Sequence, residues 1–301
     1  MTLTTEDPAV TDRYPTRRAG AQKLLPREEP TVWGSAADGP LDQATLDGFD
    51  ADGFLAVEQI LDEAEIAAYT AEMRRLATDL RFMADSRTVV DRDTQEVRAI
   101  FEVHRISELF RDLANDPRLV DKARQILGSD VYVHQSRVNY KRGLTGNDFY
   151  WHSDFETWHA EDGMPGMRAV GISIALHQIH VCNGGLMIMP GSHKTFVPCE
   201  GEPSGDYQWS LAGQEIAVPD PESLALLADR HGIHLFTGAA GHAVIFDPNC
   251  MHGSNGNITP YPRSTIFVVY NSVENTLVEP YAAVRPRPDY IAARDFAPVA
   301  G

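Results

Sequence analysis

Cysteine is scarce in this chain, and long apolar runs are missing. The 301 residues include three cysteines, Cys182, Cys199 and Cys250, with no C-x-x-C spacing. Neither a disulfide framework nor a zinc ribbon is therefore indicated, and buried free thiols are expected. The opening stretch MTLTTEDPAVTDRYPTRR has acids and prolines where a signal peptide needs an apolar region, and no run of about 18 apolar residues follows. We therefore expect a cytoplasmic protein.

Basic residues are also few. Lys and Arg total 26 against 43 Asp and Glu, which leaves a formal net charge of −17. Nucleic acids and anionic membranes select basic patches, so we expect no nucleic-acid partner and no membrane partner. The excess of carboxylates is most simply a means of staying soluble.

The order of sequence patterns predicts an N-terminal arm followed by one domain. Residues 1–45 contain five prolines among polar residues and no sustained period, so we expect an arm that lies over the domain, or is partly disordered, and is a candidate lid. Residues 46–301 form the domain, with a helical part at about residues 60–128. Its first helix is indicated by apolar residues three or four apart, namely Ile66, Tyr69, Met73, Leu76 and Leu80. A second helix, Pro117 to Leu127, should end at Gly128.

From about residue 130 to 275 the pattern changes to short apolar runs of period two. The runs are VYVHQSRVNYK, VGISIALHQIHV, GGLMIMPG, HAVIFD and STIFVVYNSV, each bounded by Gly, Pro, Asn or Asp. Many short strands with turns between them are typical of a jelly roll. The predicted fold is therefore mainly β with flanking helices around a double-stranded β-helix, or cupin-like, core.

The stretch FYWHSDFETWHAEDGMPGMRA contains a candidate metal-binding pair. If His152 and Asp154 share a strand, both side chains point to one side and can converge on an ion. With a second imidazole from elsewhere, they would form the facial triad of non-haem Fe(II) oxygenases. An H-x-D match is weak evidence by itself, because it arises by chance in many chains.

His252 is the preferred third ligand. It follows the apolar strand HAVIFD and precedes a Gly/Asn-rich turn, which places it at a strand end where small-ligand sites form. His242 is the next candidate, with a structural role more expected. Five further histidines are expected to be ordinary polar residues, namely His177, His180, His193, His231 and His234.

Arg263 follows His252 by eleven positions, at the start of the last long strand. An oxygenase that takes electrons from a 2-oxo acid needs a cation for the distal carboxylate, and a guanidinium grips a carboxylate bidentately. The joint pattern H-x-D … H-x10-R is far more specific than any of its parts.

This pattern, with GGLMIMPGSHK between, resembles the phytanoyl-CoA dioxygenase superfamily of Fe(II)/2-oxoglutarate oxygenases. FYWHSDFETWHAEDGMPGMRA is similar to the signature of its ectoine hydroxylase branch, and the likeness runs from DRYPTR to the final strand. The resemblance implies iron held by His152, Asp154 and His252, with 2-oxoglutarate and O2 as cosubstrates. It implies hydroxylation of L-ectoine to 5-hydroxyectoine with release of succinate and CO2, and a homodimer. Because Asp154 is a carboxylate, hydroxylation is favoured over halogenation.

The run VYVHQSRVNYK has a polar face made by Gln135, Arg137, Asn139 and Lys141, and a polar inward face lines a site. The resemblance implies that Gln135 contacts the substrate, that Lys141 lies near 2-oxoglutarate with Arg263, and that Asn139 is a further cosubstrate contact. A solvated edge strand is the alternative for this pattern.

Ectoine is a small zwitterion with a delocalised cationic ring, and aromatic faces attract such cations. Trp158 and Phe267 are the candidates for these faces, and Arg285 could meet the substrate carboxylate. Ordinary core packing is the alternative for Trp158.

Two other functions stay open. One is a hydroxylase of the same superfamily acting on another small zwitterion, such as a free amino acid. The other is a cupin-like protein that binds a metal or solute without catalysis. Arg263 speaks against the second, because a simple metal sensor needs no site for a 2-oxo acid.

Overall fold

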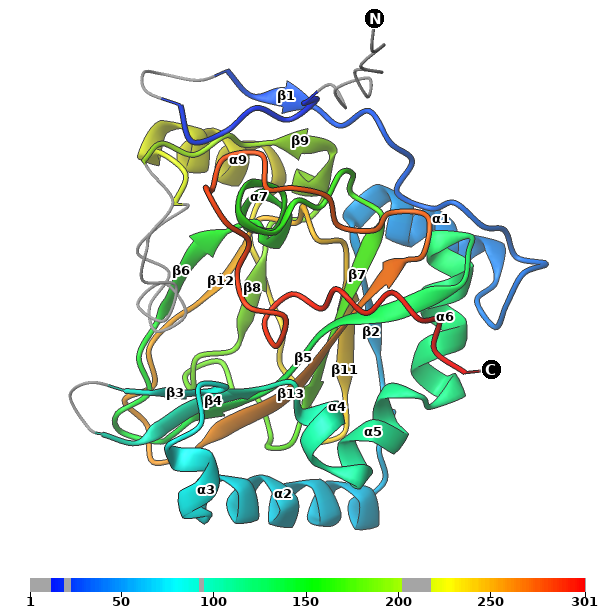
Figure 1. The fold of residues 1–301 in the computed structure, drawn as a ribbon. Helices are drawn as coiled ribbons and strands as arrows, with labels where there is room; N and C mark the ends of the chain where they lie inside the picture. Colours follow the sequence, from blue (N-terminus) through cyan, green and yellow to red (C-terminus); the bar gives the residue numbers. More distant parts are fainter. Residues whose placement is uncertain (1–11, 19–22, 92–94, 202–217, 301) are drawn as a thin grey trace, which may run out of the picture.

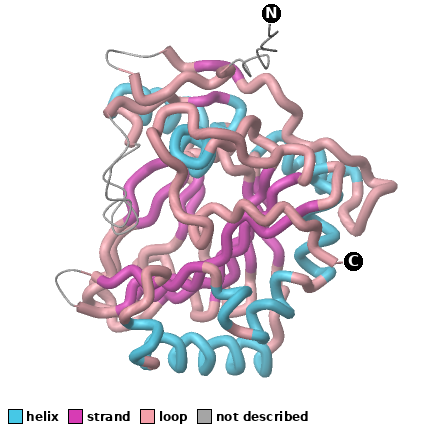
Figure 2. The backbone as a smooth tube through the Cα atoms, in the orientation of Figure 1, coloured by secondary structure: helices cyan, strands magenta, loops and turns pink. Residues whose placement is uncertain are grey.

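The centre of the protein consists of two facing antiparallel sheets. The computed structural model describes residues 12–18, 23–91, 95–201 and 218–300, with strands at the centre and helices outside (Figure 2). The larger sheet contains β2 (Phe54–Val57), β11 (Ala243–Phe246), β7 (Ala169–Ala175), β13 (Arg263–Ser272), β5 (Val131–Lys141), β4 (Val97–Phe101) and β3 (Thr88–Val90), in that order. The smaller contains β10 (His234–Leu235), β8 (Leu186–Ile188), β12 (His252–Ser254) and β6 (Phe149–His152). The predicted jelly-roll core is confirmed.

Helices cover the outer face of the larger sheet (Figure 1). Ile172, Ile266 and Val268 of the sheet share one buried cluster with Met73 and Phe110 of the helices. The described helices are α1 (Gln43–Asp52), α2 (Glu63–Thr78), α3 (Leu80–Met83), α4 (Val103–Ile106), α5 (Glu108–Ala114), α6 (Pro117–Leu127), α7 (Asp154–Thr157), the π-helical turn η1 (Trp158–Asp162), the 3-10 turn η2 (Ser192–Lys194) and α9 (Pro221–His231).

Both helices expected from the sequence are present. α6 begins after the cap Asp116 and ends at Gly128, whose φ of 59° suits glycine. α2 buries Tyr69, Met73 and Leu76 as the spacing predicted. The inclusion of Leu80 was wrong: α2 ends at Thr78, and Leu80 is 79% exposed at the start of α3. The side chain of Asp79 accepts a bond from the backbone of Arg81, which starts the new helix.

The region at residues 60–128 is not wholly helical, because β3 and β4 lie within it and extend the larger sheet past β5. The boundary between arm and domain near residue 46 stays a prediction. The expectation for the thiols holds for Cys199 and Cys250, which are buried, but was wrong for Cys182, which is exposed in the turn after β7.

The described part of the arm runs along one end of the jelly roll (Figure 1). Its strand β1 (Leu25–Pro26) pairs with β9 (Thr195–Phe196), and Tyr14 is fully buried. Residues 1–11 and 19–22 of the predicted arm lie outside the described residues, and its role as a lid stays a prediction. No helix in the described ranges is long and apolar enough to cross a membrane.

Candidate active site

His152 and His252 come from neighbouring strands of the smaller sheet. His152 ends β6, His252 begins β12, and the two are paired in register. Nδ1 of His152 lies 2.7 Å from the Tyr150 carbonyl oxygen, and Nδ1 of His252 lies 2.9 Å from that of Cys250. A carbonyl can only accept, so each Nδ1 carries the proton and each Nε2 is free to bind a metal.

Asp154 lies between these two imidazoles, but not on a strand. It is the first residue of α7, and the Ser153 side chain caps that helix by accepting a bond from the backbone of Glu156. The prediction that His152 and Asp154 share a strand face was therefore wrong. The side chains converge because the chain turns from strand to helix at Ser153. The Asp154 carboxylate oxygens lie 3.8 Å from Nε2 of His152 and 3.8 Å from Nε2 of His252.

The chemistry of this cluster fits a metal ion. The three ligand atoms lie within 4.8 Å of one another, and all three residues are buried. Oδ2 of Asp154 is buried without a hydrogen-bond partner among the described residues, which is costly unless a cation is nearby. Burial and the neighbouring His252 hold the pKa of His152 well below its usual range, so the imidazole is neutral and able to coordinate. Two imidazoles and one carboxylate are the donor set of a non-haem Fe(II) site.

No other described histidine joins this cluster. The residues outside it are His104, His134, His159, His177, His180, His193, His231, His234 and His242.

A pocket between the two sheets includes both His152 and His252 in its lining. Its other walls come mainly from the larger sheet. The polar lining includes Arg98, Arg137, Asn139, Lys141, Ser173, Ser254, Arg263 and Thr265, and the aromatic lining includes Phe101, Phe149, Phe246 and Phe267. The polar face predicted for VYVHQSRVNYK thus lines a pocket from Arg137 to Lys141.

Arg263 and Lys141 form a cationic wall of this pocket. They are paired across β13 and β5, and Lys141 Nζ donates to Ser254 Oγ and to the Asn255 carbonyl oxygen, both at 2.8 Å. Burial and the charge of Arg263 lower the pKa of Lys141 to about 6. Burial lowers the pKa of Arg263 to about 10, and its Nε has no partner among the described residues. The partly buried Arg263 guanidinium, beside an amine that can take up a proton, favours an anionic ligand.

Asn139 lies on the same wall, where its Nδ2 donates to Thr265 Oγ1 at 3.3 Å. The structure thus brings Asn139, Lys141 and Arg263, the three predicted cosubstrate contacts, to one pocket with the two histidines.

Arg137 is a site residue to which sequence reasoning gave no role. Its guanidinium lies 4.4 Å from the centre of the Phe267 ring, and its Nη1 donates to Oε1 of Gln135 at 2.8 Å. No ion pair to Arg137 occurs among the described residues, and its Nε is buried without a partner. The sequence signal that could have indicated its role was its position in the middle of the polar face of VYVHQSRVNYK. Gln135 is 3% exposed, donates to the Ile291 carbonyl oxygen at 2.7 Å, and contacts the pocket through Arg137.

The three other predicted substrate contacts differ in position. Phe267 lines the pocket. Trp158 is 3% exposed in η1, edge-on to the His134 ring with 4.9 Å between ring centres, and is not part of the pocket lining. Arg285 is exposed in the loop before Arg287, which is itself buried and paired with Asp162. The substrate roles of Trp158 and Arg285 stay predictions.

The helix that carries Asp154 is held by the N-terminal arm. Arg17 Nε lies 2.7 Å from Glu156 Oε1, and Thr16 Oγ1 donates to the same oxygen at 2.6 Å. Both charged side chains are essentially inaccessible to solvent, at 0% and 1% exposed. Because an unpaired buried charge is costly, this contact ties α7 to the arm.

A jelly roll with this donor set and an adjacent cationic pocket defines an Fe(II)/2-oxoglutarate-dependent dioxygenase. Comparison with known proteins agrees. The model of the phytanoyl-CoA dioxygenase (PhyH) family matches residues 49–265. The chain therefore belongs to the phytanoyl-CoA dioxygenase family.

Several curated relatives carry the name ectoine dioxygenase. The protein of Streptomyces avermitilis is 56% identical over 96% of this chain and 99% of its own length. That of Halomonas elongata is 50% identical over 93% of this chain and 86% of its own length. Among solved structures, EctD from Sphingopyxis alaskensis with 2-oxoglutarate and 5-hydroxyectoine is similar at a TM-score of 0.85 and 44% identity. The match covers 94% of this chain and 95% of that one. The same protein with bound Fe is similar at 0.84 and 43%, with the same coverage.

Proposed function

We propose that this enzyme hydroxylates L-ectoine at ring carbon C5 to give 5-hydroxyectoine, consuming 2-oxoglutarate and O2 and releasing succinate and CO2. The observation that carries this proposal is one pocket that joins the two metal-binding imidazoles to the basic side chains of Lys141 and Arg263. The choice of ectoine is supported by the relatives named ectoine dioxygenase and by the EctD structure with 5-hydroxyectoine.

His152, Asp154 and His252 hold Fe(II), which when bound supplies the activation of O2. Arg263 pairs with the distal carboxylate of 2-oxoglutarate through its planar fork of donors. Lys141 supplies a second positive charge, and Asn139 a polar contact beside it. The protein contributes position and a dry pocket, and no side chain acts as a nucleophile.

The substrate is oriented by residues other than Arg263 and Lys141. Ectoine carries a carboxylate and a delocalised cation, so its recognition needs one cationic and one aromatic partner. Arg137 is the partly buried cation available for the carboxylate, and it is held in place by Gln135 and by the ring of Phe267. Trp158 is proposed as the further aromatic contact. Arg285 is a second contact for the carboxylate, one that requires its exposed loop to close over the pocket.

The discriminating experiment is succinate formation by the Fe(II)-loaded enzyme with ectoine, with proline, with other free amino acids, and with no addition. The proposal predicts that ectoine alone stimulates succinate release strongly. Stimulation by another zwitterion instead would identify a sister hydroxylase. Binding of metal with no succinate under any condition would identify a non-catalytic binding protein.

We also propose that the enzyme is a cytoplasmic homodimer with no nucleic-acid or membrane partner. The support is the family resemblance for the dimer and the net charge of −17 for the absence of polyanionic partners. Light scattering on the purified protein tests the dimer, and a monomer mass would contradict it.

A further inference from the structure

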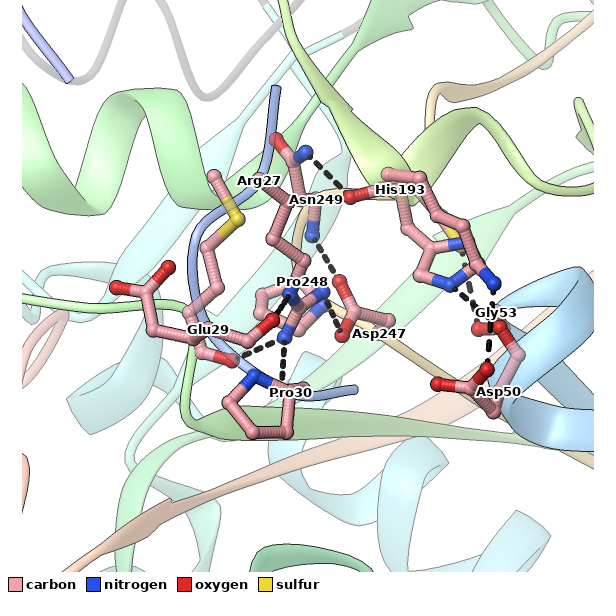
Figure 3. Close-up of polar contacts among 12 residues, drawn as sticks. Arg27, Glu29, Pro30, Asp50, Gly53, His193, Asp247, Pro248 and Asn249 are labelled. Atoms are coloured by element: carbon pink, nitrogen blue, oxygen red, sulfur yellow. Dashed lines mark hydrogen bonds and ion pairs between the residues drawn. The ribbon is translucent and has the colours of Figure 1, made fainter. Parts of the chain in front are cut away.

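A buried hydrogen-bond network lies outside the ligand cluster. It joins the chain segments that carry the ligands His152, Asp154 and His252. Its centre is the turn Asp247–Pro248–Asn249 (Figure 3). This turn follows β11 and ends shortly before His252. Asp247 and Asn249 are each 1% exposed, and neither lines the pocket with His152 and His252. Any effect of these side chains on the ligand cluster is therefore transmitted through other residues.

Asn249 connects the turn to the segment between His152 and Asp154. Its Oδ1 accepts a hydrogen bond from Ser153 Oγ at 3.1 Å, and Ser153 stands directly between the two ligands. Its Nδ2 donates to the carbonyl oxygens of His193 and Thr195, at 2.8 and 3.1 Å (Figure 3 shows the bond to His193). The backbone N–H of Phe155 donates to the Pro248 carbonyl oxygen at 2.9 Å, which is a second hydrogen bond between the turn and the segment that carries Asp154.

Arg27 of the arm locks this turn from the other side (Figure 3). Its Nη1 lies 2.6 Å from Asp247 Oδ2, with the two side chains 4% and 2% exposed. Its other donors bond the carbonyl oxygens of Glu29, Pro30 and Met167, at 3.0, 3.1 and 2.7 Å. Oδ1 of Asp247 accepts a hydrogen bond from the backbone N–H of Asn249 at 2.8 Å. The same carboxylate therefore contacts both Arg27 and Asn249.

We propose that Arg27 and Asn249 are positioning residues for the metal centre, which hold His252 in register with His152 and Asp154 through the Asp247–Asn249 turn. This inference rests on the proposed metal site. Groups that orient metal ligands without touching the metal typically contribute 10- to 100-fold to metal affinity. The network has the connectivity for this, because one buried turn is bonded both to the arm and to the residue between two ligands.

The test is a titration of the metal-free protein with Co(II) under anaerobic conditions, followed by its visible spectrum, beside a thermal melt of the metal-free protein. Asn249→Ala and Arg27→Gln should weaken the Co(II) dissociation constant by roughly 10- to 100-fold and alter the spectrum. Arg27→Lys keeps a charge for Asp247 but cannot reach all three carbonyls, and should fall between Arg27→Gln and the wild type.

Gln125→Ala is the matched control. Gln125 is also a fully buried amide, and its Nε2 donates to the carbonyl oxygens of Ser35 and Leu41, at 2.9 and 2.8 Å, without contacting a ligand segment. It should lower the melting temperature while leaving Co(II) affinity unchanged. A lower melting temperature with wild-type Co(II) affinity in Asn249→Ala would overturn the proposal, as would equal loss of affinity in Gln125→Ala.

If Asn249→Ala does not fold, Arg27→Lys and Ser153→Ala decide the question. Ser153→Ala removes the hydroxyl that donates to Asn249, and wild-type affinity in both variants would contradict the proposal. A wild-type protein that binds no Co(II) or Fe(II) would sink the metal site and this inference together. A wild-type protein that binds metal but ignores ectoine would remove the proposed substrate and leave the positioning role standing.

Discussion

His152 and His252 are opposite each other on the antiparallel strands β6 and β12, with 4.1 Å between their ring centres. Each ring is held by the carbonyl oxygen two residues earlier in the chain, at Tyr150 and at Cys250. This near-symmetric arrangement directs both Nε2 atoms to the Asp154 carboxylate, which the start of α7 places on the third side.

Alanine at His152, Asp154 or His252 should abolish hydroxylation and stoichiometric iron binding. The wild type should bind one Fe(II) per chain at its three-ligand site, and each variant should lose that iron because it lacks one of the three ligands. Metal content after anaerobic loading and 5-hydroxyectoine yield measure this. His242→Ala should retain both, since His242 lies outside the cluster. Full activity in His252→Ala would refute the ligand assignment.

Arg263→Ala should raise the 2-oxoglutarate requirement steeply while iron stays bound. Truncating one partner of a buried charge pair costs about 2–5 kcal/mol, which corresponds to roughly 30- to 5,000-fold in affinity. Arg263→Lys should recover part of the loss, because it keeps the charge without the bidentate fork. Unchanged dependence on 2-oxoglutarate in Arg263→Ala would place the carboxylate elsewhere.

Binding of 2-oxoglutarate should take up a proton near pH 8. The free pKa of Lys141 is lowered to about 6 by burial and by Arg263, so the amine is mainly neutral at that pH. A bound dianion favours the ammonium form and raises this pKa, so affinity should strengthen as the pH falls toward 6. Calorimetry in buffers of different ionisation enthalpy counts the protons. Lys141→Met should lose the uptake, and equal uptake in both proteins would exclude Lys141 as its source.

Trp158→Ala separates a substrate contact from a core residue. A contact to the ectoine cation should be worth roughly 0.5–2 kcal/mol, and its loss should let 2-oxoglutarate be consumed without matching hydroxylation. Trp158→Phe should keep part of the coupling. Because Trp158 is buried beside His134, the melting temperature should fall in either case. An unchanged ratio of 5-hydroxyectoine to succinate in Trp158→Ala would make it a core residue alone.

The local pattern predicted what depends on neighbours in the chain. Alternation in VYVHQSRVNYK predicted β5, and Gly128 after Pro117–Leu127 predicted the end of α6. The strand parity assumed for His152 and Asp154 failed because α7 starts at Asp154. That start depends partly on Phe155 N–H donating to the Pro248 carbonyl oxygen, a contact between segments distant in sequence.

Contacts between distant segments also explain what could not be predicted. Arg27 and Asp247 are separated by 220 positions, and Arg17 and Glu156 by 139, so no spacing in the chain connects them. Arg137 was visible as one polar residue on a strand face, but its stacking on Phe267 depends on the pairing of β5 with β13. The exposure of Arg285 depends on the path of its loop. The segment AVRPRP has no periodic pattern from which that path could be predicted.

The most direct test of the central claim is the reaction of the Fe(II)-loaded enzyme with 2-oxoglutarate and ectoine under labelled dioxygen, analysed by mass spectrometry. A dioxygenase of this type should place one labelled oxygen atom in 5-hydroxyectoine and one in succinate, with the two products formed in equal amounts and little succinate without ectoine. Succinate formed at the same rate with and without ectoine, and no hydroxylated ectoine, would contradict the account.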